Sequence, residues 1–198
     1  MAYKPNDHYA RKAKGEGYLA RSVFKLQELD KKARLFRKGD HVLDLGASPG
    51  SWSQYAAQQV GPQGFVLGVD LTEMNLALPN AAFVQDDVYE MDLPALAQAH
   101  GLRLPVDLVI SDMAPNTSGS PQTDHLRSHQ LCEMGLHMAQ QHLKPGGHYV
   151  CKFFDGIKFQ PFRQALQAHF HKVQMLRPKS TRSSSRELFF MALNKKEG

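Results

Sequence analysis

The stretch Asp44-Leu45-Gly46-Ala47-Ser48-Pro49-Gly50-Ser51-Trp52 decides the fold, because it joins a short apolar run to a helical pattern. The apolar run covers residues 41–45 and predicts a strand, and residues 52–60 predict a helix. Gly46 and Gly50 permit positive φ angles and a close approach of the backbone to a ligand. We therefore expect a strand–turn–helix whose turn receives a ligand.

Two further polar stretches follow predicted strands. Ser111-Asp112-Met113-Ala114-Pro115-Asn116 comes after the run 106–110, and Lys152 closes the run 148–152. Ligands of open α/β sheets bind outside the carboxyl ends of the strands. The three stretches therefore indicate one site, in which a carboxylate and an amine lie where chemistry on the ligand would take place.

Strand and helix patterns alternate along the rest of the chain. The predicted strands are residues 41–45, 65–69, 82–85, 106–110, 148–152, 172–177 and 188–193. The first predicted helix begins at Tyr18 and ends at Arg37-Lys38-Gly39-Asp40, and the others are residues 52–60, 93–100, 125–143 and 162–170. This alternation is typical of a mostly parallel sheet with helices on both faces. No helix separates the last two strands, so we expect one of them to be antiparallel.

The length of 198 residues, with 42% hydrophobic and 22% charged residues, fits one soluble domain. Residues 1–17 have no periodic apolar face, so we expect a flexible basic segment there and a single domain over residues 18–198. No apolar run has the length of a membrane span or of a signal-peptide core. Cys132 and Cys151 are the only cysteines, and we expect them to be reduced thiols of a cytoplasmic protein.

The net charge of +5 is unevenly distributed. Residues 1–38 hold eleven Lys and Arg against four Asp and Glu, and residues 172–198 hold seven against two. Residues 39–171 hold six against thirteen and are therefore acidic. A basic head and tail around an acidic middle indicate a polyanionic partner that touches both ends. Solvated termini are the alternative interpretation.

Two acidic residues close the second and third predicted strands. The dinucleotide fingerprint G-x-G-x-x-G and the phosphate-binding loop ending in Gly-Lys-Ser/Thr are both absent, which disfavours a pyrophosphate ligand. Asp70 stands where an acidic residue accepts hydrogen bonds from ribose hydroxyls. Asp87 is placed to face an adenine amino group. The pattern indicates an adenosine-containing cofactor.

Three stretches together resemble the FtsJ/RrmJ family of S-adenosylmethionine-dependent RNA ribose methyltransferases: residues 44–54, 111–119 and 143–147. The similarity extends from about Tyr18 to Leu193. It implies an α/β, Rossmann-like methyltransferase fold with a seven-stranded sheet whose last strand is antiparallel. It also implies S-adenosylmethionine as cofactor, with contacts from Gly50, Trp52, Asp70, Asp87 and Asp112.

Two positions depart from the family pattern. Asp86 stands where bacterial members have glycine, which leaves open whether Asp86 or Asp87 faces adenine. Ser51 replaces a second glycine.

The same resemblance implies a catalytic tetrad of Lys25, Asp112, Lys152 and Glu187. A ribose 2′-hydroxyl is a poor nucleophile, and its proton must leave as it attacks the methyl group. Lys152 must be uncharged to accept that proton. Burial and the charge of Lys25 favour the uncharged amine, whereas the two carboxylates favour the ammonium form. Whether Lys152 is a full base or mainly steers the hydroxyl stays open at this point.

The expected substrate is a uridine ribose of 23S rRNA, within a large ribosomal subunit that is assembled or nearly so. The stretch Asp112-Met113-Ala114-Pro115-Asn116 disfavours an amino-directed base methyltransferase, and the missing glycine fingerprint disfavours a nicotinamide oxidoreductase. The short chain disfavours a cap ribose methyltransferase. A non-catalytic RNA-binding module stays an alternative, because the basic ends would serve it equally, and turnover with labelled cofactor on RNA separates it from an enzyme. We expect a monomer that binds neither DNA nor membrane, with RNA contacts from the basic head and from Arg182 and Arg186. His125 and His129 are spaced like metal ligands, but we expect helix-surface residues and no metal.

Overall fold

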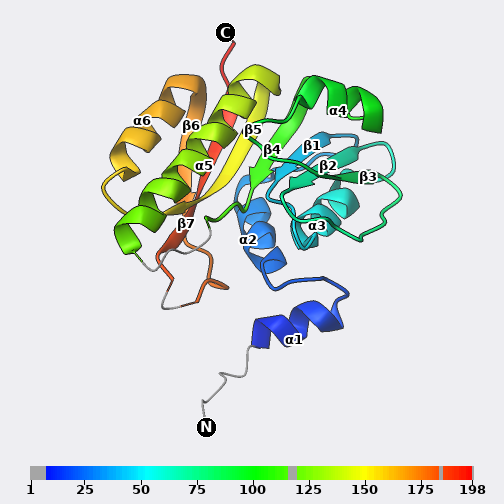
Figure 1. The fold of residues 1–198 in the computed structure, drawn as a ribbon, viewed down its shortest axis with the longest axis horizontal. Helices are drawn as coiled ribbons and strands as arrows, with labels where there is room; N and C mark the ends of the chain where they lie inside the picture. Colours follow the sequence, from blue (N-terminus) through cyan, green and yellow to red (C-terminus); the bar gives the residue numbers. More distant parts are fainter. Residues whose placement is uncertain (1–7, 116–119, 183–184, 198) are drawn as a thin grey trace.

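The computed structural model describes residues 8–115, 120–182 and 185–197, and within them seven strands form one sheet (Figure 1). The order across the sheet is β3-β2-β1-β4-β5-β7-β6. β1 to β5 pair in parallel, and β7 lies antiparallel between β5 and β6. The predicted fold class, including the antiparallel last strand, is confirmed. The strands are β1 His41–Leu45, β2 Phe65–Asp70, β3 Ala81–Gln85, β4 Val106–Ser111, β5 Leu143–Phe154, β6 Phe170–Leu176 and β7 Glu187–Lys195.

Helices cover both faces of the sheet and enclose two apolar cores. One core lies under α2 and α3, and the other lies under α4, α5 and α6. Cys132 and Cys151 are buried free thiols in the second core. Among the described helices, none is both long and apolar enough to cross a membrane. The helices are α1 His8–Gly15, α2 Val23–Ala33, α3 Ser51–Val60, α4 Leu93–His100, α5 Pro121–His142 and α6 Phe159–His169.

The strand order reverses at β1, which pairs with β2 on one side and with β4 on the other. The chain leaves β1 towards one half of the sheet and leaves β4 towards the other. Such a switch point opens a crevice at the carboxyl ends of the two strands, where ligands of α/β proteins bind. The loops after β1 and β4 belong to two of the stretches from which the sequence predicts the site, residues 44–52 and 111–116.

Residues 8–15 form α1, a helix that the sequence pattern does not predict. The flexibility expected for residues 1–17 stays a prediction. Ala13 is buried, and the rings of Tyr9 and Phe24 lie 5.5 Å apart. The apolar face of α1 consists only of Tyr9 and Ala13, and two residues are too few to reveal a helical periodicity in the sequence. The next helix, α2, is also shorter than predicted, since it begins at Val23 and ends before Arg34, which adopts the left-handed conformation.

Boundaries elsewhere lie within about four residues of the prediction, with β5 as the main exception. Lys144-Pro145-Gly146-Gly147 is a turn-forming sequence that precedes the predicted strand 148–152, yet it lies inside β5. The pairing between β4 and β5 shifts register there, from Val106–Leu143 to Leu108–His148. The turn is thus a bulge within one strand.

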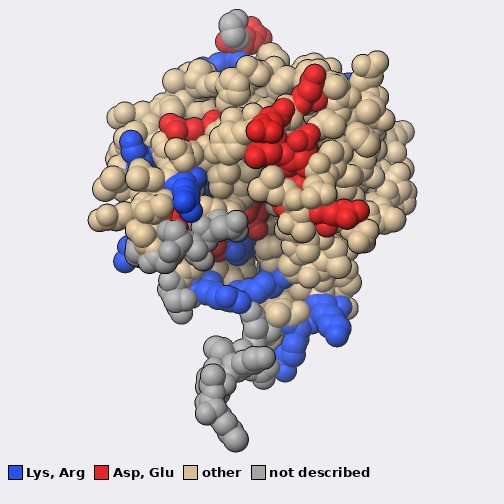
Figure 2. All heavy atoms as spheres, viewed as in Figure 1, with Lys and Arg blue, Asp and Glu red and all other residues tan. Residues whose placement is uncertain are grey.

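Opposite charges gather on different parts of the face shown in Figure 2. Lys and Arg atoms lie along its lower edge, where Figure 1 places α1 and α2. Asp and Glu atoms gather above them, over the region of the carboxyl ends of the parallel strands. The uneven charge seen along the sequence therefore becomes two separate surface regions on one face.

Candidate active site

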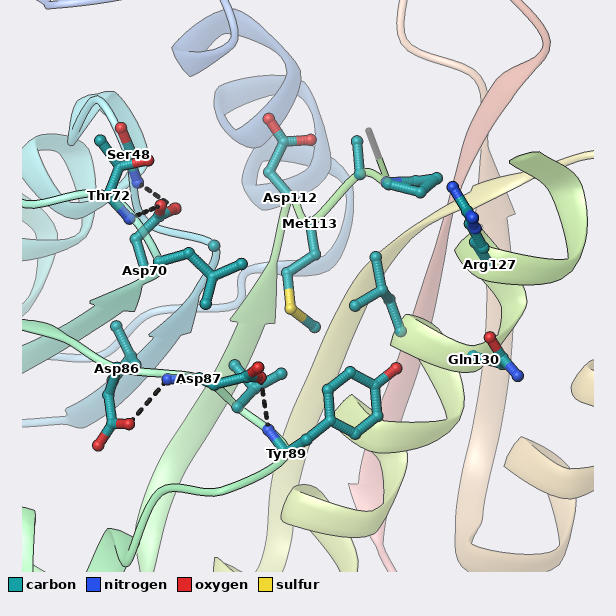
Figure 3. A pocket seen from close by; sticks show the side chains of 17 residues that line it. Ser48, Asp70, Thr72, Asp86, Asp87, Tyr89, Asp112, Met113, Arg127 and Gln130 are labelled. Carbon is teal, nitrogen blue, oxygen red and sulfur yellow. Dashed lines mark hydrogen bonds between the residues drawn. The ribbon is translucent and has the colours of Figure 1, made fainter. Parts of the chain in front are cut away.

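The loops after β1, β2, β3 and β4 line a pocket of about 660 Å³ at the carboxyl edge of the sheet (Figure 3). Gly46 and Met113 lie where the loops after β1 and β4 meet. A Cβ atom on Gly46, which has a φ of 75°, would lie 2.6 Å from Cγ of Met113. Glycine is therefore required there, and the close approach brings the two loops together as the walls of one pocket.

Gly50 has a φ of 112° and caps the start of α3. It faces the side chains of Leu19 and Leu76 and is not part of the pocket wall. Its role as a direct cofactor contact remains a prediction.

Asp70 and Asp87 point into the pocket from the ends of β2 and β3. The carboxylate of Asp70 accepts hydrogen bonds from the main-chain N–H groups of Ser48 (3.0 Å) and Thr72 (2.8 Å), which fix its orientation. Asp87 accepts from the N–H of Tyr89 (3.0 Å), and Figure 3 shows its carboxylate beside that residue. The carboxylate of Asp86 instead accepts from the N–H of Asp87 and points away from Met113.

The four residues of the expected tetrad form two ion pairs. The ammonium nitrogen of Lys152 lies 3.1 Å from Oδ1 of Asp112 and donates to the main-chain carbonyl of the same residue. The ammonium nitrogen of Lys25 lies 2.5 Å from Oε1 of Glu187. All four side chains are at least four-fifths buried, with exposures between 8% and 18%. Each lysine therefore has its own carboxylate, a pairing that the sequence did not reveal.

Phe189 links the two ion pairs. It lies opposite Lys152 in the ladder between β5 and β7, and the Lys25 ammonium lies 5.8 Å from its ring centroid. Asp112 lines the first pocket, whereas Lys25 and Glu187 line a second one of about 360 Å³. The second pocket is completed by Arg21, Ser22, Arg182 and Ser185. One lysine–carboxylate pair thus contributes Asp112 to the first pocket, and both residues of the other pair line the second pocket.

The indole of Trp52 lies in the core and not in the first pocket. Its exposure is 2%, its ring packs 5.7 Å from Phe189, and its Nε1–H donates to the carbonyl of Ser22 (2.9 Å). The expectation that Trp52 contacts the cofactor can therefore hold only for its main chain. The indole joins α3 to the turn before α2.

Asp44 is the fully buried carboxyl group beneath the loop after β1. Its Oδ2 accepts from the hydroxyl of Ser53 (2.6 Å), while Oδ1 has no hydrogen-bond partner among the described residues. The pKa of Asp44 is raised to about 7, mainly by burial and in addition by the nearby carboxylates of Asp112 and Asp70. The hydrogen bond from Ser53 lowers the pKa and offsets part of this rise. The ligand-free site therefore holds a carboxyl group that titrates near neutral pH.

Comparison with known proteins assigns the family. The model of the FtsJ-like methyltransferases matches residues 18–195. The chain belongs to this family. It is 50% identical over 99% of its length to the complete "ribosomal RNA large subunit methyltransferase E" of Bdellovibrio bacteriovorus. It is 47% identical over 98% of its length to the protein of the same name from Desulfosudis oleivorans, of which it covers 93%.

A crystal structure described as a ribosomal RNA methyltransferase from Plasmodium falciparum has the same fold. It matches with a TM-score of 0.79 and 27% identity, over 91% of this chain and all of the other. The FtsJ-like methyltransferase architecture is thus seen in a protein of much lower identity.

The histidines of α5 differ from the expectation for this FtsJ-like methyltransferase. His129 is 7% exposed and packs edge-on against Phe153 and Phe162, so the prediction of a surface residue is wrong. Burial lowers its pKa, while Glu133, 3.3 Å away, raises it. Among the described residues, no three His, Cys, Asp or Glu side chains are grouped to hold a metal ion.

Several residues of the site carry no recognisable signal in the sequence. Tyr89, Arg127 and Gln130 line the far side of the first pocket (Figure 3). Arg127 and Gln130 come from α5, three residues apart and thus on one face of the helix. Pairs of polar residues three apart occur on every helix, so the sequence does not show which face of α5 lines the pocket. Residues 116–119 of the quoted motif, and Ser183 and Ser184, lie outside the described part of the chain.

We predict that Trp52→Ala destabilises the protein by roughly 3–5 kcal/mol, because it empties a buried ring site. Trp52→Phe should cost about 1 kcal/mol, since it keeps a ring in the core but leaves the Ser22 carbonyl without its donor. Denaturant unfolding measures both values. Cofactor affinity of folded Trp52→Phe should stay within about twofold of the parent. A large loss of affinity at unchanged stability would show that the indole contacts the cofactor.

We predict that Asp44→Asn stabilises the ligand-free protein at pH 8 by roughly 1–4 kcal/mol. The folded-state pKa lies above the unfolded value, so the carboxyl costs stability as pH rises from about 4 to about 7, and the cost stays constant above that. Asparagine removes this cost, and its carbonyl oxygen still accepts from Ser53.

Unfolding free energies of parent and Asp44→Asn from pH 4 to pH 8 test this. Asp155→Asn, at an exposed position after β5, is the control and should show no pH-dependent difference. A constant difference between parent and Asp44→Asn across this range would contradict the titration.

Proposed function

We propose that the protein transfers a methyl group from S-adenosylmethionine to the 2′-hydroxyl of a uridine ribose in 23S rRNA of the large ribosomal subunit. The observation that carries the proposal is the largely buried Lys152–Asp112 pair, whose carboxylate lines the first pocket. The names of the relatives from Bdellovibrio and Desulfosudis support rRNA as the substrate.

The first pocket fits S-adenosylmethionine by its donors, acceptors and shape. Asp70 is held by two main-chain N–H groups and keeps acceptor capacity for ribose hydroxyls. Asp87 points towards the side of Tyr89 and would accept from the adenine amino group, so we assign this contact to Asp87 and not to Asp86. Asp112 lies beside the expected methionine moiety. When bound, S-adenosylmethionine supplies an electrophilic methyl group on a positively charged sulfur.

Lys152 is the residue placed to handle the proton of the attacking hydroxyl. Its ammonium nitrogen is ion-paired with the carboxylate of Asp112 and donates to the main-chain carbonyl of Asp112, and Asp112 lines the first pocket. The uncharged amine accepts the proton as the oxygen attacks, and Asp112 keeps the nitrogen aimed at that oxygen. Lys25 and Glu187 line the second pocket and would orient the ribose there. Holding the reacting groups in line removes much of the entropic cost of the transfer.

The charge distribution supports RNA as the partner. Arg11, Lys12 and Lys14 lie on α1, and Arg182 lines the second pocket. Figure 2 shows Lys and Arg atoms along the lower edge of the face, where Figure 1 places α1 and α2. Contacts of these groups with phosphates would release counterions, which makes binding dependent on salt. Four aspartates, Asp70, Asp86, Asp87 and Asp112, line the first pocket, where a cofactor with positive charges is expected. We propose a monomer that acts on large-subunit RNA in the cytoplasm.

We predict that Asp70→Asn weakens S-adenosylmethionine binding about ten- to a hundredfold, because a charge-assisted hydrogen bond is worth roughly 1.5–3 kcal/mol. The amide keeps the size of the carboxylate and one oxygen acceptor. Titration calorimetry measures the dissociation constant. Glu73→Gln removes the same charge from an exposed neighbour and serves as the control. Equal affinities for Asp70→Asn and Glu73→Gln would remove Asp70 from the site.

We predict that Lys152→Met lowers the single-turnover rate of methyl transfer at least a hundredfold, the typical contribution of a positioned base. Methionine fills the buried site but carries no proton acceptor for this step. Cofactor affinity should change little, because the lysine acts on the hydroxyl. The substrate is large-subunit RNA from cells that lack the gene, and Lys172→Met, at an exposed position on β6, is the control. A near-parental rate for Lys152→Met would refute its role as base.

A further inference from the structure

The segment 177–186, which joins β6 to β7, is attached to the rest of the protein at Ser180. Ser180 has an exposure of 0%, although Lys179 beside it is exposed. Further along the segment, Arg182 and Ser185 reach the second pocket. The position of these two side chains therefore depends on what holds Ser180.

Glu28 of α2 holds this segment. Its Oε1 accepts from the main-chain N–H (3.0 Å) and from the hydroxyl (2.7 Å) of Ser180, and its Oε2 accepts from the N–H of Lys179 (2.7 Å). The guanidinium of Arg21 donates to the carbonyl of Ser180. Every polar group of Ser180 is thus bound by a charged side chain at or next to α2. Hydrogen bonds to charged groups are the stronger ones.

The same side of α2 supplies Lys25 to the tetrad. Lys25 and Glu28 are three residues apart on α2, which places them on one face of the helix, and Arg21 lies in the turn directly before it. Arg21 and Glu28 bind Ser180 within the segment, and Lys25 binds Glu187 directly after it. Ser180 and Glu187, which flank Arg182 and Ser185 in the sequence, are therefore both held by side chains on α2 or in the turn directly before it.

If only its charge is considered, Glu28 should weaken RNA binding. It lies within the basic residues 1–38, and a negative charge there repels phosphates. It lines neither of the two pockets described above, and its oxygens are occupied by the segment. The hydrogen bonds of Glu28 thus order the segment, while its charge reduces the attraction between the protein and RNA phosphates. Removing the charge should weaken RNA binding if the ordering matters more, and should strengthen it if the repulsion matters more.

We propose that Glu28 is a positioning residue, which holds Ser180 so that Arg182 meets an RNA phosphate at the mouth of the second pocket. This inference rests on the proposed function, because the ligand of Arg182 is the RNA that carries the target ribose. The sequence alone gives no sign of it, since a glutamate on a helix is ordinarily a solvated surface residue.

The test compares Glu28→Gln with Glu16→Gln, which removes the same charge from the basic head. Glu16 is partly exposed and lies 3.8 Å from Lys12, away from segment 177–186. KM for RNA should rise about tenfold in Glu28→Gln, because two main-chain donors lose a charged acceptor. It should stay equal or fall in Glu16→Gln. kcat at saturating RNA and the dissociation constant of S-adenosylmethionine should stay near the parent values in both variants.

Arg182→Ala, made in the parent and in Glu28→Gln, tests whether Glu28 acts through Arg182. In the parent it should raise KM and reduce the slope of log KM against log salt. In Glu28→Gln it should have less than half of that effect, because the arginine is no longer held in place. Additive effects of the two substitutions would overturn the proposal.

Ser180→Ala removes one donor to Glu28 and leaves the helix intact, so it replaces Glu28→Gln if that variant fails to fold. It should raise KM for RNA without changing kcat. A KM for Glu28→Gln equal to that of Glu16→Gln, in a parent that methylates RNA, would refute the positioning role and leave the proposed function standing. A parent that neither binds nor methylates RNA would overturn both.

Discussion

The reversed direction of β7 is the constraint on which the site depends. Because β7 runs antiparallel to β5, its first residue, Glu187, pairs with Phe154 at the carboxyl edge of the sheet. A parallel strand in this position would place Glu187 at the opposite edge, away from Lys152. The reversal also delivers the segment 177–186 to the edge where the loops after β1 and β4 lie. One antiparallel strand thus adds a carboxylate and a basic segment to a site that parallel strands alone could not complete.

The charges of the site are arranged in pairs and in regions. Each buried lysine has one carboxylate within 3.1 Å, and an unpaired charge at this depth would be strongly destabilising. Beyond the pairs, the cofactor pocket is rich in carboxylates, and the second pocket is rich in arginine and lysine. In the proposed function, this matches a positively charged cofactor on one side and a polyanionic substrate on the other.

The sequence predicts the elements better than their contacts. β1 and α4 have the expected boundaries, because strong apolar patterns are bounded by clear turn residues. α1 was missed because its apolar face consists of two residues, and the bulge in β5 because Pro145-Gly146-Gly147 is ordinarily a turn. The resemblance supplied all four residues of the tetrad. Which lysine pairs with which carboxylate depends on the packing of α2 against β7, and no local pattern encodes that.

Trp52 and Glu28 show why single residues are harder to interpret than motifs. Trp52 stands in the cofactor loop, yet its indole points into the core, because α3 packs against the sheet with that face. Glu28 resembles a solvated helix residue, yet it binds a segment about 150 residues further along the chain. Side-chain direction and long-range partners are properties of the packed structure, so sequence position alone shows neither the orientation of the Trp52 indole nor the partner of Glu28.

The turn before α2 connects both halves of the site. Ser22 accepts from the indole of Trp52 through its carbonyl, and its hydroxyl lies 2.8 Å from that of Ser51. Arg21, its neighbour, binds Ser180, and Lys25 one turn later binds Glu187. The start of the cofactor-side helix α3 and the basic segment are therefore held by the same few residues. Leu26 and Leu29 of α2 pack in the same apolar core as α3, so the helix that binds the basic segment is also fixed against the sheet.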